Sequence, residues 1–112
     1  MLASLAALAT GCHSTRPAAT PAGPHFRILT YNVNWGGARP DLAADLIRSS
    51  GADIVCLQET TPEWERHLRP SLARDYSFAA FRHSTTRTGG GLAFLARVPA
   101  REVAYVPSHT GW

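Results

Sequence analysis

Two apolar segments of this sequence end in side chains of the types that bind metal ions and phosphate groups. Asn32 lies near the end of residues 26–35, and Gln58 and Glu59 end the segment that starts at Asp53. A carboxylate that follows a buried strand is costly unless it is paired or binds a metal. Glu59 therefore suits Mg²⁺, which uses one or two carboxylates together with phosphate oxygens. Asn32 can donate to a phosphate oxygen and accept from water.

The spacing of these residues leaves a second interpretation open. Glu59 could be a solvated charge that leads into the next helix, and Asn32 a buried amide with satisfied hydrogen bonds. The first interpretation requires the two side chains to meet.

The surrounding residues predict a strand, a helix and a second strand. Residues 26–35 carry apolar side chains on both faces, which is typical of a strand covered on both sides. Residues 41–50 predict a helix that Gly51 closes in the left-handed conformation. Residues 53–58 predict the second strand. The expected apolar face of the helix consists of Leu42, Leu46 and Ile47.

A strand, helix and strand within about 33 residues form a βαβ unit, whose strands are parallel and joined by a right-handed crossover. Parallel neighbours place their carboxyl ends at one edge of the sheet, where open α/β sheets commonly bind ligands. We therefore expect Asn32 and Glu59 to converge there.

A second helix is predicted to begin after Thr61, which can cap it, with Pro62 in its first turn. Trp64 and Leu68 should face the core, and Pro70 should interrupt or kink the helix.

The rest of the chain predicts an antiparallel pair and a short last strand. Residues 76–82 and 91–97 form the pair, and residues 101–106 form the last strand. Cys56, inside an apolar segment, is interpreted as a small buried thiol, and we expect no disulfide between it and Cys12.

Two of these segments resemble the signature segments of a known family. Ile-Leu-Thr-Tyr-Asn-Val at residues 28–33 and Asp-Ile-Val-Cys-Leu-Gln-Glu at residues 53–59 resemble the first two signature segments of the endonuclease/exonuclease/phosphatase family, which has the deoxyribonuclease I-like fold. Residues 90–97 are similar to its third recognisable strand. The resemblance covers roughly residues 26–106.

The resemblance implies an α/β fold, part of a four-layer sandwich of two packed mixed sheets with outer helices, here truncated. It implies hydrolysis of a phosphodiester or phosphomonoester with Mg²⁺ or Mn²⁺. Glu59 would hold the metal, and Asn32 would share in the catalytic and metal site by fixing the scissile phosphate and the nucleophile. The substrate could be a nucleic acid, a phospholipid or a sugar phosphate, and the oligomeric state is open.

The chain departs from the family pattern beyond these segments. A strand ending in His, a Gly-Asp-Phe-Asn motif and a final Asp-His pair, which supply the general base and the other metal ligands, are absent. His109 lies in a polar tail and is interpreted as a surface residue, as are His67 and His83. Arg82 and Arg87 could lie near phosphate, but scattered surface arginines are the ordinary case. We expect this N-terminal part to be inactive by itself.

The first 25 residues predict an exported lipoprotein. Residues 1–12 are typical of a signal peptide that ends in a lipobox with Cys12 as the lipidated residue, and residues 13–25 of a flexible tether. Residues 26–112 would be the domain. The expected location is the bacterial cell envelope, anchored by lipid to the outer membrane and facing the periplasm or the exterior. A disordered N-terminus with a chance cysteine is the alternative.

The amino-acid composition indicates a globular protein but does not indicate a function. The 112 residues are 45% hydrophobic and 17% charged, which suits a globular protein. The net charge of +3 comes with scattered arginines and no lysine, which does not by itself indicate nucleic-acid binding. A non-catalytic surface lipoprotein that uses the same fold for binding is the alternative function.

Overall fold

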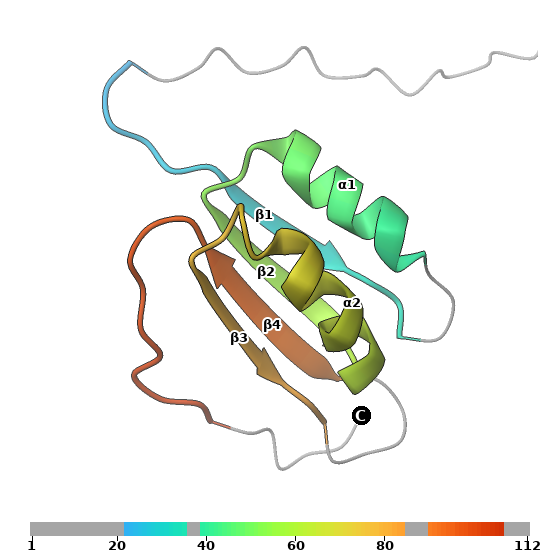
Figure 1. Cartoon of the computed structure of the whole chain (residues 1–112). Helices are drawn as coiled ribbons and strands as arrows, with labels where there is room; N and C mark the ends of the chain where they lie inside the picture. Colours follow the sequence, from blue (N-terminus) through green and yellow to red (C-terminus); the bar gives the residue numbers. More distant parts are fainter. Residues whose placement is uncertain (1–21, 36–38, 85–89, 107–112) are drawn as a thin grey trace, which may run out of the picture.

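The computed structural model describes residues 22–35, 39–84 and 90–106. Cys12, Arg87 and His109 lie outside these ranges. Four strands and two helices follow one another along the chain (Figure 1): β1 Ile28–Asn32, α1 Pro40–Ser50, β2 Ile54–Thr60, α2 Pro62–Leu72, β3 Phe78–Arg82 and β4 Gly91–Ala96. Neither described helix has the length and apolar character needed to cross a membrane.

The four strands form one mixed sheet in the order β1-β2-β4-β3. β1 and β2 are parallel, with Asn32 opposite Gln58, and β3 and β4 are antiparallel. Both pairings confirm the predictions. The sequence did not indicate that β4 lies between β2 and β3, where it also pairs antiparallel with β2.

Both helices cover the same face of the sheet (Figure 1). The core lies between them and the sheet. Trp64 and Leu68 face it as predicted, being 3% and 0% exposed. The largest fully buried side chains come from both layers: Ile47, Leu68 and Leu72 from the helices, and Val55, Leu57 and Leu95 from the strands. This covered face positions the carboxyl ends of β1 and β2.

Helix α1 has the predicted bounds to within one residue, and Gly51 ends it with φ 61°. Its predicted apolar face is confirmed for Ile47, which is 0% exposed, and wrong for Leu42 and Leu46, which are 56% and 45% exposed. The helix instead buries Ala43, Ala44 and Ile47. Small alanine side chains let the backbone of a helix approach its neighbours closely, and this rotates the two leucines outward.

Helix α2 begins as predicted, since the Thr61 side chain accepts a hydrogen bond from the Trp64 N–H at 3.3 Å. The predicted interruption at Pro70 is wrong, because the helix continues to Leu72. A proline removes one backbone donor and crowds the preceding turn. Pro70 lies two residues before the end of the helix.

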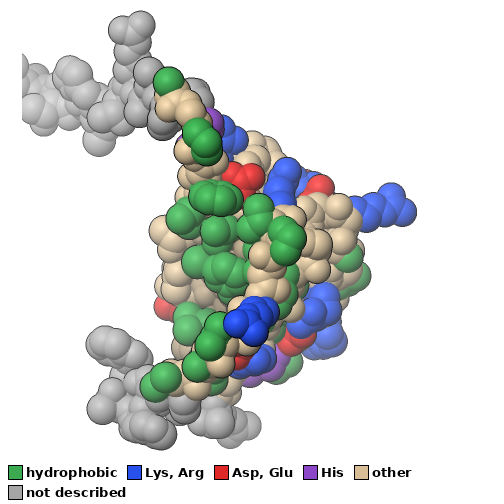
Figure 2. All heavy atoms as spheres, turned by 90° about the vertical axis from the view of Figure 1, so that its left-hand side faces the viewer, with side chains coloured by type: hydrophobic (Ala, Val, Ile, Leu, Met, Phe, Trp, Pro, Cys, Tyr) green, Lys and Arg blue, Asp and Glu red, His purple; other side chains and the backbone are tan. Residues whose placement is uncertain are grey.

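The other face of the sheet is open within the described residues. Ile28 is 63% exposed and Leu92 is 47% exposed. Cys56 is half-buried rather than buried. The predicted strand over residues 26–35, covered on both sides, is therefore wrong in two respects: β1 is shorter, and helices cover one of its faces. Figure 2 shows hydrophobic side chains gathered on this side of the molecule. The second sheet of the predicted sandwich is not among the described residues.

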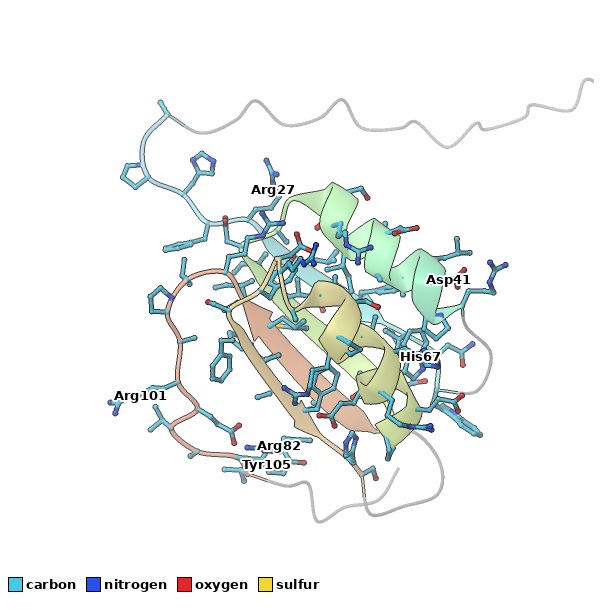
Figure 3. All side chains as sticks on the ribbon, viewed as in Figure 1. Arg27, Asp41, His67, Arg82, Arg101 and Tyr105 are labelled. Atoms are coloured by element: carbon cyan, nitrogen blue, oxygen red, sulfur yellow. The ribbon has the colours of Figure 1, made fainter. Side chains whose placement is uncertain are left out.

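Residues 101–106 form no strand, contrary to the prediction, and they are exposed. Side chains hold them beside β3. Arg82 forms an ion pair with Glu102 at 2.5 Å, and its guanidinium lies 5.8 Å from the ring centre of Tyr105 (Figure 3). Arg82 is therefore engaged with Glu102 and Tyr105 of its own chain.

Candidate functional site

Asn32 and Glu59 meet at the carboxyl edge of β1 and β2. Asn32 Nδ2 donates a hydrogen bond to Glu59 Oε1 at 2.8 Å. The parallel pairing aligns Asn32 with Gln58, the residue before Glu59. The convergence predicted from the sequence is thus present, and the interpretation of Asn32 as a buried amide is wrong because Asn32 is exposed.

A second hydrogen bond fixes the orientation of the Asn32 amide. The backbone N–H of Asn34 donates to Asn32 Oδ1 at 2.8 Å. A backbone N–H can only donate, so the oxygen of the amide must face Asn34 and its NH₂ group must face Glu59. Asn34 makes this possible with a left-handed backbone, φ 53°. Asparagine tolerates that conformation better than most residues.

An irregularity in β2 directs Glu59 towards Asn32. The register with β4 shifts between Gln58 and Thr60, and Glu59 has φ 60°. Without the shift, strict alternation would place Glu59 on the same face as Leu57, under the helices. The bulge instead buries Thr60, which is 2% exposed, and leaves Glu59 half-exposed.

Gln58 lies in a different arrangement from Glu59. Its side-chain Nε2 donates to Thr30 Oγ1 at 2.9 Å, along the open face of the sheet. The site therefore contains the carboxamide of Asn32 in contact with the carboxylate of Glu59. The side chain of Gln58 is hydrogen-bonded to the neighbouring strand instead.

The donor set of this pair fits part of a divalent-metal site. Glu59 is only half-buried, so the argument from costly burial does not apply and the geometry carries the assignment. Because the Asn32 oxygen faces Asn34, the carboxylate of Glu59 is the ligand that the pair presents in this conformation. Mg²⁺ is commonly held by one or two carboxylates, with waters and phosphate oxygens completing its shell. Across residues 22–35, 39–84 and 90–106, no three His, Cys, Asp or Glu side chains form a metal-binding group.

The four aspartates, which all lie in the described ranges, are engaged elsewhere. Asp41 is paired with Arg39 at 2.8 Å, and the hydrogen bond from that guanidinium lowers the pKa of Asp41. Asp45 and Asp75 both contact Arg48, at 2.9 and 3.3 Å. Asp53 accepts from the backbone N–H of Arg27 at 2.8 Å. Each of these carboxylates therefore has a hydrogen-bond partner other than Asn32 or Glu59.

His67 and His83 differ in their contacts. His67 on α2 is exposed, as expected (Figure 3). His83 is also exposed, as expected, and its Nε2 lies 2.6 Å from Glu65 Oε2. Burial raises the pKa of Glu65, yet the hydrogen bonds from Arg69 and His83 outweigh it and hold the pKa below its ordinary value. The four-residue spacing of Glu65 and Arg69 could have revealed that pair, whereas nothing local links His83 to it.

Comparisons with known proteins agree with this architecture. The sequence model of the endonuclease/exonuclease/phosphatase family matches residues 29–112. The fold is similar to the crystal structure of an endonuclease/exonuclease/phosphatase from Beutenbergia cavernae DSM 12333, with a TM-score of 0.52 and 22% sequence identity. That similarity covers 66% of this chain and 26% of the other, so this chain corresponds to about a quarter of its length. None of the curated proteins matches the sequence. Since the family model spans most of the chain, the chain belongs to the endonuclease/exonuclease/phosphatase family.

Proposed function

We propose that the protein to which this chain belongs hydrolyses phosphodiesters or phosphomonoesters, as a nuclease or phosphatase, with Mg²⁺ or Mn²⁺. The observation that carries the proposal is the 2.8 Å hydrogen bond between Asn32 and Glu59 at the carboxyl edge of two parallel strands. Membership of the endonuclease/exonuclease/phosphatase family supports the class of reaction.

In this proposal Glu59 provides a carboxylate ligand and Asn32 positions it. The amide N–H holds Oε1 in place and keeps the carboxylate directed towards the edge of the sheet. Asn32 could also turn its NH₂ group to a phosphate oxygen when substrate arrives. A bound divalent ion would stabilise negative charge on the phosphoryl oxygens and on the leaving group.

The general base and the other metal ligands belong, by the family resemblance, to segments that this chain does not contain. We therefore expect the 112-residue chain to be inactive by itself, because such groups act as a unit. Nucleic acid, phospholipid and sugar phosphate all remain candidate substrates.

The test is hydrolysis of bis(p-nitrophenyl) phosphate by the full-length protein with Mg²⁺ or Mn²⁺. Glu59→Gln keeps the shape of the side chain but removes its charge, and Glu59→Ala removes both. Both should lower kcat/KM by at least about a hundredfold, more than the loss typical of a residue outside the ligand shell. Glu63→Gln, an exposed carboxylate in the first turn of α2, is the matched control. Unchanged activity in both Glu59 variants would refute the assignment.

We also propose that the protein is anchored in the cell envelope by lipid on Cys12. The support is the apolar segment and the small residues that precede this cysteine. Labelled palmitate should be incorporated into the wild-type protein and not into Cys12→Ser. Equal labelling of the two would exclude Cys12 as the lipidated residue.

A further inference from the structure

The bulge at Glu59 rests on a close approach between two backbones. Gly91, the first residue of β4, pairs with Thr60 immediately after the register shift. A Cβ atom placed on Gly91 would lie 1.9 Å from the carbonyl oxygen of Thr60 and 2.9 Å from its carbonyl carbon. Both are backbone atoms, so no side-chain rotation could relieve the clash.

Thr60 is also enclosed by the protein. Its side chain is 2% exposed, and its Oγ1 is a buried atom without a hydrogen-bond partner in the described part of the chain. A Cβ on Gly91 would also lie 3.0 Å from that oxygen. Thr60 can therefore be displaced only by moving the backbone of β2 at the bulge.

We propose that Gly91 is a positioning residue for the site, and that its missing side chain sets the bulge that directs Glu59 to Asn32. If β4 were pushed away from Thr60, the left-handed Glu59 would no longer be followed by the paired Thr60 that fixes the end of the bulge. A non-glycine residue adopts that conformation only when the surrounding structure imposes it. The carboxylate would then leave the 2.8 Å hydrogen bond with Asn32.

The neighbouring glycine provides a matched control. Gly90 has φ 93°, so alanine there is strained and should destabilise the protein. Among the described residues, a Cβ on Gly90 would nevertheless meet only Ser84 atoms, at an ordinary contact distance of 3.5 Å. Gly90→Ala therefore adds strain beside β4 without pressing on Thr60.

Two measurements test the inference. Mn²⁺ binding rests on the proposed function, whereas the NMR signal of the Asn32 side chain does not depend on metal. In the metal-free full-length protein, the ¹⁵N-detected side-chain amide signal of Asn32 reports its hydrogen bond to Glu59. Gly91→Ala should move this signal towards its position in Glu59→Ala. It should also weaken Mn²⁺ binding, measured by the EPR signal of free Mn²⁺, by about 10- to 100-fold. Gly90→Ala should leave both readouts as in the wild type.

A folded Gly91→Ala protein whose Asn32 signal stays at the wild-type position would overturn the inference. If Glu59→Ala leaves Mn²⁺ binding unchanged, the proposed function fails, and the Asn32 signal still decides the role of Gly91. If Gly91→Ala does not fold, two double variants decide instead. Glycine adopts more backbone conformations than alanine, so at position 59 it would let the bulge adjust to the alanine at position 91. The double variant Gly91→Ala/Glu59→Gly should therefore fold, whereas Gly91→Ala/Glu59→Ala should not. Equal failure of both double variants would contradict the coupling.

Discussion

Two residues with left-handed backbones lie on either side of the contact at the site. Asn34 has φ 53° and Glu59 has φ 60°, and they are the non-glycine residues with positive φ in the described ranges. Each positive φ has a structural consequence: Asn34 turns its N–H to the Asn32 oxygen, and Glu59 turns its carboxylate to the Asn32 amide. Backbone strain of this kind persists where the surrounding structure imposes one local conformation.

The stability of variants at position 34 should therefore depend on how well the new residue tolerates a positive φ. Asn34→Gly and Asn34→Asp should leave the free energy of unfolding within about 1 kcal/mol of the wild type. Asn34→Val should lower it by roughly 1–2 kcal/mol, because the left-handed region is strained for a β-branched residue, whereas glycine, asparagine and aspartate tolerate it. Urea unfolding followed by circular dichroism measures the differences. If the Asn34→Val protein is as stable as the Asn34→Gly protein, the backbone at this position is not left-handed.

The sequence predicted the meeting of Asn32 and Glu59 but not the means by which they meet. Parallel pairing follows from the βαβ pattern, and it brings the ends of two strands together. The bulge could not be predicted, because it depends on Gly91 pairing with Thr60 across 31 positions of sequence. A glycine inside a strand does suggest a close backbone approach, but it does not identify the backbone that approaches.

Among the secondary-structure elements, Glu65 links α2 to the end of β3. Its Oε1 accepts from Arg69 Nε and Nη2 at 2.8 and 2.6 Å, and its Oε2 lies 2.6 Å from His83 Nε2. Arg69 also donates to the backbone oxygen of Ala79 at 3.2 Å. A single carboxylate thus connects the helix to a strand at the margin of the sheet.

The cluster of Glu65, Arg69 and His83 predicts that the free energy of unfolding falls at low pH. Because the pKa of Glu65 is lower in the folded chain than its ordinary value of 4.5, its stabilising effect is complete above about pH 4.5 and is lost as the pH falls through the folded-state pKa. Glu65→Gln should therefore flatten the fall in unfolding free energy below about pH 4.5. Glu63→Gln on the same helix is the control. Urea titrations at about pH 3 to 7 measure the slopes, and identical slopes for wild type and Glu65→Gln would contradict the prediction.

Helices and strands were predictable where local chemistry decides them. Gly51 and Thr61 mark a helix end and a helix start by capping, which involves neighbouring residues only. The apolar face of α1 was mispredicted, since hydrophobicity favoured Leu42 and Leu46 while close packing selected alanines. Residues 101–106 have the composition of a strand but pair with no described strand, and the side chain of Arg82 contacts them through Glu102.

At the scale of the whole molecule, the sheet has one covered and one open face. Alternation along β1, β2 and β4 places Ile28, Cys56 and Phe94 on the open face, and Cys56 pairs with Phe94 across the strands. Phe78 and Phe94 stack edge to face at 6.1 Å, which covers part of the surface. β1 and β3 are both edge strands. Exposed apolar faces of this kind favour association.

The 112-residue chain alone should therefore self-associate through this face. Ile28→Lys places a charge on the open face at the edge strand and should shift the sedimentation profile towards the monomer. Leu46→Lys is the matched control, because Leu46 is 45% exposed on the outer side of α1 rather than on the open face, compared with 63% for Ile28. Analytical ultracentrifugation over a range of concentrations distinguishes the two. If Leu46→Lys reduces association as much as Ile28→Lys, the added charge itself rather than its place on the open face controls assembly. If neither variant reduces association, the open face is not the contact surface.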